Sequence, residues 1–261
     1  MVIDGKKIAR KIIESLKIMP KPQKKLAAIF VGENPASISF LKQKEKIAKE
    51  LSVEFQLIKL PENISEQNLI GEIKKFNNDQ SVGGILIQLP LPKKFDREKV
   101  IQALDPKKDI DALLPLTKVL PLAVEVVKDI LEEMHWSLEN KVVGVVGRGF
   151  LVGRPVAEWL SGKCREIIIF HTKTDLSRIK DCDLIISGAG KAGLIKPENL
   201  KDGASVIDFG FDMQEGQIRG DLDSSKLSNS STHELGFYTP TPGGTGPILV
   251  AELFKNFYQL S

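Results

Sequence analysis

Three glycines between an apolar run and a helical segment are the strongest sign of chemistry in the sequence. The run 142–146 leads into Gly147-Arg148-Gly149-Phe150-Leu151-Val152-Gly153, and helical spacing follows. In a dinucleotide-binding turn, the first glycine permits a tight turn, the second lets the backbone approach the pyrophosphate, and the third allows close helix–strand packing. The helix N-terminus then offers N–H groups to phosphate. Gly147, Gly149 and Gly153 therefore predict a dinucleotide site, and a turn that serves only packing is the alternative.

The residues after the next strand-like run indicate which dinucleotide binds. An NAD site usually carries Asp or Glu about 20 residues further on, where it holds the ribose 2′-hydroxyl. Here the run 167–170 ends in His171-Thr172-Lys173-Thr174, without an acid. Hydroxyl and ammonium donors there, together with Arg148 in the turn, suit a 2′-phosphate. The sequence therefore favours NADP over NAD, the alternative being that His171, Thr172 and Lys173 are ordinary loop residues.

Two later segments each follow a strand-like run and carry small residues. They are Ser187-Gly188-Ala189-Gly190-Lys191 and Asp208-Phe209-Gly210-Phe211-Asp212. Ligands of α/β proteins bind at the carboxyl ends of the strands. We therefore expect Gly190 and Phe211 to belong to the cofactor site, where small residues let the nicotinamide and ribose approach the backbone. Taken singly, each segment is equally well explained as a structural turn.

Apolar runs alternate with helical segments along the chain, which is typical of α/β proteins. We expect Ser37 to cap the second helix. The expected strands are 26–31, 54–60, 84–89, 142–146, 167–170, 184–187 and 204–208, and the expected helices include 5–17, 37–51, 65–77 and 247–260.

These two series of elements predict two α/β domains with a cleft between them. We assign residues 1–120 to the first domain, which the C-terminal helix at 245–261 completes. The second domain, at 121–244, is expected to be Rossmann-like, with a doubly wound parallel sheet, because it contains the strand and glycine turn of the dinucleotide site.

Composition excludes several classes of protein. The 261 residues are 42% hydrophobic and 27% charged with a net charge of +3, an ordinary globular composition. No basic stripe with interleaved aromatics indicates nucleic-acid binding, and no apolar run reaches the ~20 residues that span a bilayer. Cys164 and Cys182 form no CxxC or Cys/His cluster, so no metal site is expected. We expect a cytoplasmic protein that binds neither nucleic acid nor membrane.

Five motifs follow one another along the chain. They are 31–37 with Phe40 and Lys44, Gln88-Leu89-Pro90-Leu91-Pro92, Lys107-Lys108-Asp109-Ile110-Asp111, 147–155, and Thr239-Pro240-Thr241-Pro242-Gly243-Gly244-Thr245-Gly246-Pro247. In this order they resemble the signature of the methylenetetrahydrofolate dehydrogenase/cyclohydrolase family. The resemblance implies oxidation of 5,10-methylenetetrahydrofolate with NADP and hydrolysis of the methenyl product to 10-formyltetrahydrofolate. It also implies a homodimer that associates through its nucleotide domains, and a place in one-carbon metabolism and purine biosynthesis.

The resemblance assigns roles to individual residues. Lys44 matches the catalytic lysine, Gln88 the glutamine that hydrogen-bonds it, and Asp111 the aspartate that holds the pterin. A lysine removed from water has a lowered pKa and can move protons near neutral pH, and a neutral glutamine orients it without keeping it charged. Further substrate-binding residues implied by the motifs are Phe40, Leu89, Pro242, Gly243 and Gly246.

Three departures from the family's pattern leave alternatives open. Phe40 replaces a tyrosine whose hydroxyl would lie near the lysine, and Gly149 stands where a serine is usual. The segment after Asp111 is shortened, and Ala112 follows where a glycine is normal. Hydrolysis requires proton transfer to and from water, so we expect it to suffer more than hydride transfer. The alternatives are a dehydrogenase without cyclohydrolase activity and a degenerate folate- or nucleotide-binding protein.

Overall fold

The computed structural model describes residues 1–172, 174–214, 216–227 and 234–261. The chain divides into two compact units. The three-stranded unit comprises Arg10–Leu122 with Val250–Ser261, and the four-stranded unit comprises Met1–Ala9 with Ala123–Leu249. These bounds differ from the expected domains chiefly at two places, because residues 1–9 and 245–249 belong to the four-stranded unit. Residues 1–9 belong to the four-stranded unit, because the Ile3 N–H donates to the Tyr238 carbonyl and the Tyr238 N–H donates to the Met1 carbonyl.

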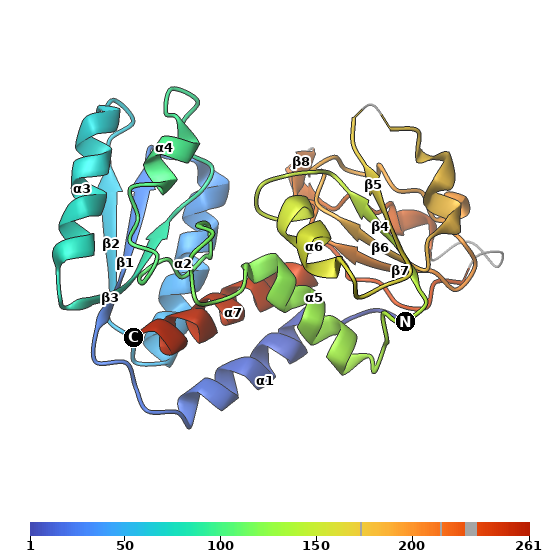
Figure 1. The fold of residues 1–261 in the computed structure, drawn as a ribbon, viewed down its shortest axis with the longest axis horizontal. Helices are drawn as coiled ribbons and strands as arrows, with labels where there is room; N and C mark the ends of the chain where they lie inside the picture. The colour runs from blue at the N-terminus through green and yellow to red at the C-terminus, as the bar shows by residue number, and fades with distance from the viewer. Residues whose placement is uncertain (173, 215, 228–233) are drawn as a thin grey trace. The chain divides into compact units, whose positions relative to one another are not determined.

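The three-stranded unit is built on a parallel sheet in the order β2-β1-β3. Its strands are β1 (Lys25–Val31), β2 (Phe55–Leu60) and β3 (Val82–Ile87). β3 is buried along its whole length, and β1 is buried at every residue after Lys25. Helices α2 (Pro35–Glu50) and α3 (Glu66–Asn78) lie on opposite sides of this sheet (Figure 1). The short α4 (Arg97–Ile101) adds Val100 to the core cluster beneath α3.

The start of α2 corrects one expectation. Asn34, not Ser37, is the N-cap residue, and its side-chain oxygen accepts a hydrogen bond from the Ser37 N–H at 3.0 Å. Pro35 follows at the first helical position, where its fixed φ suits the helix and its missing N–H costs nothing. Ser37 is therefore inside the first turn and is buried.

The four-stranded unit contains a parallel sheet in the order β5-β4-β6-β7. Because β5 lies on one side of β4 and β6 on the other, the strand order reverses at β4, as in doubly wound folds. The predicted α/β fold class with a Rossmann-like second sheet is confirmed. The strands are β4 (Val142–Val146), β5 (Glu166–Phe170), β6 (Leu184–Ser187) and β7 (Ser205–Asp208).

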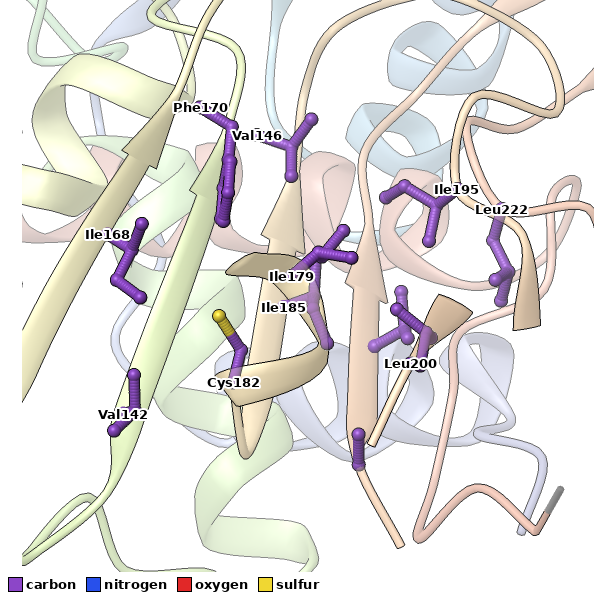
Figure 2. Close-up of a cluster of buried hydrophobic side chains, with 12 residues drawn as sticks. Val142, Val146, Ile168, Phe170, Ile179, Cys182, Ile185, Ile195, Leu200 and Leu222 are labelled. Carbon is purple, nitrogen blue, oxygen red and sulfur yellow. The ribbon is translucent and has the colours of Figure 1, made fainter. Parts of the chain in front are cut away.

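Apolar side chains from all four strands form the core of this sheet (Figure 2). Phe170, Ile185 and Val146 are buried there together with Cys182, which is a free thiol. The sequence did not predict a small antiparallel hairpin made by β8 (Asp212–Gln214) and β9 (Gln217–Arg219). The remaining elements of this unit are α6 (Gly153–Leu160), η1 (Leu176–Asp181), η2 (Pro197–Asn199) and η3 (Ser224–Lys226).

Three further helices lie at the points of the sequence where one unit ends and the other begins. Helix α1 (Gly5–Lys17) and helix α7 (Thr245–Leu260) each contain residues of both units, and α5 (Leu122–Glu133) begins where the three-stranded unit's first segment ends. In the described part of the chain, no helix combines the length and apolarity needed to cross a membrane.

Candidate functional site

Lys44 and Gln88 form a buried hydrogen-bonded pair in the three-stranded unit. Lys44 lies on α2 and Gln88 directly follows β3, and each is only 8% exposed. Lys44 Nζ donates to Gln88 Oε1 at 3.0 Å, and Gln88 Nε2 donates to the Leu89 carbonyl at 2.7 Å. Burial lowers the pKa of Lys44, because desolvation disfavours the ammonium form. The expected hydrogen bond between Lys44 and Gln88 is present, and the pKa of Lys44 is shifted in the expected direction. A catalytic role for either residue stays a prediction.

Asp111 interacts electrostatically with this lysine from the loop between α4 and α5. Burial raises the pKa of Asp111 to about 6; the Lys44 charge acts against this shift and the Asp109 charge adds to it. Within the described residues, no group donates a hydrogen bond to the Asp111 carboxylate. A desolvated carboxylate without protein donors is suited to a ligand that brings its own N–H groups.

Two of the five predicted substrate-binding residues belong to the same unit. Phe40 lies one turn before Lys44 on α2 and is half-buried. Leu89 packs against the core cluster beneath β3. Pro242, Gly243 and Gly246 belong to the four-stranded unit, in the turn that precedes α7 and in its first turn. Contact with substrate stays a prediction for all five residues.

The glycine turn after β4 has the steric requirements of a dinucleotide-binding turn at two of its three glycines. Gly147 has a φ of +89°, and a Cβ there would lie 2.9 Å from the Gly188 carbonyl oxygen. A Cβ on Gly153 would lie 1.9 Å from the Gly147 carbonyl oxygen, so α6 packs against the turn backbone to backbone. Gly149 is different, because its Cβ would meet only the Gly188 oxygen at 3.8 Å. Gly149 therefore has room for a side chain.

The N-terminus of α6 fits the phosphate groups that such a turn holds. Its N-cap residue, Val152, makes no side-chain cap hydrogen bond. Helix N-termini attract anions through their free N–H groups and the helix dipole. One expected donor is already used, since the Arg154 N–H donates to the Gly149 carbonyl at 3.0 Å. Arg148 in the turn is exposed and lies within reach of solvent-borne anions.

The carboxyl end of β5 carries the residues expected to discriminate between cofactors. His171 and Thr172 are exposed directly after the strand, and Thr174 closes the turn by accepting from the His171 N–H at 3.3 Å. Lys173 lies outside the described residues. No acid stands among the residues 171–174, so the position that holds a ribose 2′-hydroxyl in NAD sites has no carboxylate.

Sequence reasoning missed a buried aspartate that organises the edge of the same sheet. Asp221 is fully buried and accepts from Ser187 Oγ at 2.5 Å, the Ala189 N–H at 2.7 Å and the Lys191 N–H at 2.7 Å. It thereby holds the turn after β6, which contains Gly190 at a φ of +65°. No local pattern marks Asp221, because its burial comes from a strand that lies more than thirty residues earlier in the sequence.

A second buried aspartate lies at the end of β7. Asp208 accepts from the Gly210 N–H at 2.6 Å and from the Leu222 N–H at 2.9 Å. Leu222 directly follows Asp221 in the sequence. Burial raises the pKa of Asp208 to about 6, and the nearby Asp221 charge adds to the shift. The predicted cofactor residue Phe211 follows and is 36% exposed, and a Cβ on Gly190 would lie 3.8 Å from its carbonyl oxygen. Gly147, Gly190 and Phe211 thus lie at the carboxyl edge of one sheet.

Two family models together match most of the chain. The model described as tetrahydrofolate dehydrogenase/cyclohydrolase, catalytic domain, matches residues 3–111. The model described as tetrahydrofolate dehydrogenase/cyclohydrolase, NAD(P)-binding domain, matches residues 121–261. The first match contains Lys44, Gln88 and Asp111, and the second contains the glycine turn.

Individual relatives are similar over nearly their full lengths. The bifunctional protein FolD of Clostridium tetani is 34% identical over 278 positions, which cover 100% of this chain and 99% of the relative. These positions outnumber the 261 residues of the chain, so the chain lacks residues that the relative has.

Two solved structures are similar to this chain over its whole length. The bifunctional methylenetetrahydrofolate dehydrogenase/cyclohydrolase FolD of Campylobacter jejuni has a TM-score of 0.91 at 33% identity, covering 100% of this chain and 98% of that chain. The Trypanosoma brucei enzyme, complexed with NADP cofactor and an inhibitor, has a TM-score of 0.91 at 27% identity, covering 100% of this chain and 96% of that chain.

Proposed function

The chain belongs to the tetrahydrofolate dehydrogenase/cyclohydrolase family, and we propose that it oxidises 5,10-methylenetetrahydrofolate with NADP and hydrolyses the 5,10-methenyl product to 10-formyltetrahydrofolate. The observation that carries this proposal is the buried, hydrogen-bonded pair of Lys44 and Gln88, together with the electrostatic interaction between Lys44 and Asp111. A buried lysine is costly to the fold, so its retention beside two matching polar groups favours a chemical role.

Lys44 and Asp111 divide the work on the folate. The Asp111 carboxylate accepts hydrogen bonds from the pterin amino group and a ring nitrogen. No protein donor in the described residues competes with the pterin for this carboxylate. Lys44, with its lowered pKa, takes a proton from the water that adds to the methenyl carbon and returns it to N5 as the bond between that carbon and N5 breaks. The remaining hydroxyl proton leaves to solvent as the 10-formyl carbonyl forms. Gln88 accepts from Lys44 Nζ at 3.0 Å and holds it in position. The Phe40 ring stacks on the aminobenzoate of the folate.

The four-stranded unit holds the cofactor. Bound NADP supplies the hydride acceptor at its nicotinamide ring. Gly147, Gly149 and Gly153 bring backbone and the α6 N-terminus to the pyrophosphate, and Arg148 with the residues after β5 binds the 2′-phosphate. The turns that contain Gly190 and Phe211 bound the nicotinamide end.

A dehydrogenase without cyclohydrolase activity is the second candidate. Phe40 lacks the hydroxyl that the family places near the lysine, and the segment after Asp111 is short. Both features should affect hydrolysis, which needs proton transfer to and from water, more than hydride transfer, which depends on the placement of the cofactor.

Assembly, location and pathway are also proposals. We propose that the three-stranded unit is the folate-binding domain and the four-stranded unit the NADP-binding domain, in place of the expected bounds 1–120 with 245–261 and 121–244. The family resemblance supports a cytoplasmic homodimer that associates through its nucleotide domains. The product, 10-formyltetrahydrofolate, would supply one-carbon units to purine biosynthesis.

One spectrophotometric assay tests the proposal. Formation of NADPH from NADP and, separately, of NADH from NAD is followed with methylenetetrahydrofolate as substrate, and 10-formyltetrahydrofolate is quantified in the same samples. Reduction of NADP with 10-formyl product supports the bifunctional enzyme, and reduction without that product supports the second candidate. Phe40→Tyr should then raise hydrolysis relative to reduction, and equal hydrolysis in wild type and variant would show that the missing hydroxyl does not limit the step. No reduction of either cofactor contradicts both candidates.

A further inference from the structure

Asn256, on the last helix, makes two hydrogen bonds that bracket the loop containing Asp111. The residue is 1% exposed and belongs to the three-stranded unit. Its Nδ2 donates to the Ile110 carbonyl at 2.9 Å and to the Leu120 carbonyl at 3.1 Å. One amide nitrogen has two N–H groups, so both are used. Asn256 therefore ties together the two ends of residues 110–120, called the Asp111 loop below.

The Asp111 loop has no regular structure of its own to fix its shape. It contains no helix or strand, since α4 ends at Ile101 and α5 begins at Leu122. Directly before the loop, the buried Asp109 Oδ2 accepts from the Leu114 N–H and from Thr117 Oγ1 of the loop, each at 2.8 Å. These side-chain contacts, rather than a backbone ladder, hold the loop closed.

The Ile110 carbonyl belongs to the peptide group that precedes the Asp111 Cα. A hydrogen bond to that carbonyl fixes the plane of this peptide, and the plane sets the direction in which Asp111 leaves the backbone. The Ile110 side chain is anchored as well, because a Cβ on Gly84 of β3 would lie 2.6 Å from Ile110 Cγ2 and 2.8 Å from the Phe257 ring. The bonds of Asn256 thus act on a residue that is already packed between β3 and α7.

Asp111 depends on its backbone for orientation, because no described group donates a hydrogen bond to its carboxylate. We propose that Asn256 is a positioning residue for folate binding, which acts by fixing the peptide group before Asp111 and the width of the Asp111 loop. The inference rests on the proposed function, and it adds a residue of the last helix, 146 positions from Ile110 in sequence, to the folate-binding apparatus.

The test compares KM values of purified full-length variants in the dehydrogenase assay. Asn256→Leu keeps a similar volume and removes both donors, and it should raise the KM for methylenetetrahydrofolate about tenfold, as expected for two lost hydrogen bonds. The KM for NADP should change less than about twofold. Asn77→Ala is the matched control, since Asn77 also ties a loop of this unit by accepting from the Asp105 N–H and donating to the Ala103 carbonyl. It should leave the KM for the folate unchanged.

A double-mutant cycle separates positioning from a merely structural role. If Asn256 acts through Asp111, then Asn256→Leu should raise the folate KM less than about twofold in an Asp111→Asn background. An equal rise in both backgrounds, or equal rises for the folate and for NADP, would overturn the inference. Where Asn256→Leu does not fold, Asn256→Ser enters the same cycle, because one hydroxyl can serve at most one of the two carbonyls. An inactive wild type contradicts the proposed function, whereas an active wild type with an unchanged folate KM in the variant contradicts this inference alone.

Discussion

The two units prepare for ligands in opposite ways. In the three-stranded unit, charged and polar side chains have been moved out of water at a cost: Lys44 and Asp111 both have pKa values shifted towards their neutral forms by burial. In the four-stranded unit, the ligand edge is defined by missing side chains, at Gly147 and Gly153, and by aspartates that hold backbone N–H groups. The first arrangement supplies reactive groups, and the second supplies room and backbone dipoles.

This difference teaches where each unit tolerates change. A side-chain site fails when its functional group is replaced, even by a residue of similar shape. A backbone site fails when a side chain is added, whatever its chemistry. The two units should therefore respond to different substitutions and affect different substrates.

The largest expected effect is the loss of hydrolysis in Lys44→Met. Removing a general acid–base group lowers the rate by about 10²- to 10⁴-fold, while NADP affinity should stay unchanged, because the glycine turn belongs to the other unit. Lys42→Met is the matched control, an exposed lysine on the same helix. Stopped-flow decay of the methenyl compound measures hydrolysis, and wild-type hydrolysis in the Lys44 variant would remove this residue from the mechanism.

Gly153→Ala should break the backbone site and leave the side-chain site intact. The new Cβ would lie 1.9 Å from the Gly147 carbonyl oxygen, which should destabilise the fold by about 3 kcal/mol and weaken NADP binding. Gly149→Ala is the control in the same turn, where a Cβ meets nothing closer than 3.8 Å. Thermal unfolding without NADP measures the stability of the fold, and the rise of the unfolding temperature on adding NADP measures NADP binding. Equal losses in the two variants would show that the comparison of the glycines is wrong.

The pH dependence of folate binding should follow Asp111. With a pKa of about 6, this carboxyl is mostly ionised at pH 7 and mostly protonated at pH 5, so its capacity to accept is lost as the pH falls. The KM for methylenetetrahydrofolate should rise about tenfold between pH 7 and pH 5. The pKa of Asp208 is also about 6, so the KM for NADP must be measured separately. In Asp111→Asn the folate KM should lose this inflection, and an unchanged inflection would assign it to another group.

The smallest expected effect is on stability alone. Ala112 has a φ of +51°, a left-handed conformation that favours glycine. Ala112→Gly should therefore stabilise the fold by about 0.5–1 kcal/mol, seen as a higher midpoint in urea. Ala103→Gly, at a residue without positive φ, should destabilise by a similar amount. A fall in stability for Ala112→Gly would mean that the loop has adapted to alanine in another way.

Much of the fold could be predicted from the sequence because its signals are local. Continuous apolar runs, helical spacing and the glycine turn each depend on neighbouring residues, and the seven parallel strands lie within a few residues of the expected runs. The cap of α2 was placed on Ser37 instead of Asn34 because both residue types cap well and only the chain path into Pro35 decides between them.

The candidate site was only partly predictable, because some of its residues are marked by local sequence signals and others are not. The sequence by itself determined the glycine turn, the absence of an acid after β5, and, through the order of its motifs, Lys44, Gln88 and Asp111. Only the tertiary structure decided that Asp221 and Asp208 are buried at the ends of the strands, and that Asn256 ties the Asp111 loop. Burial depends on residues that are distant in sequence, so no neighbouring residues distinguish these buried polar groups from the exposed ones that they resemble.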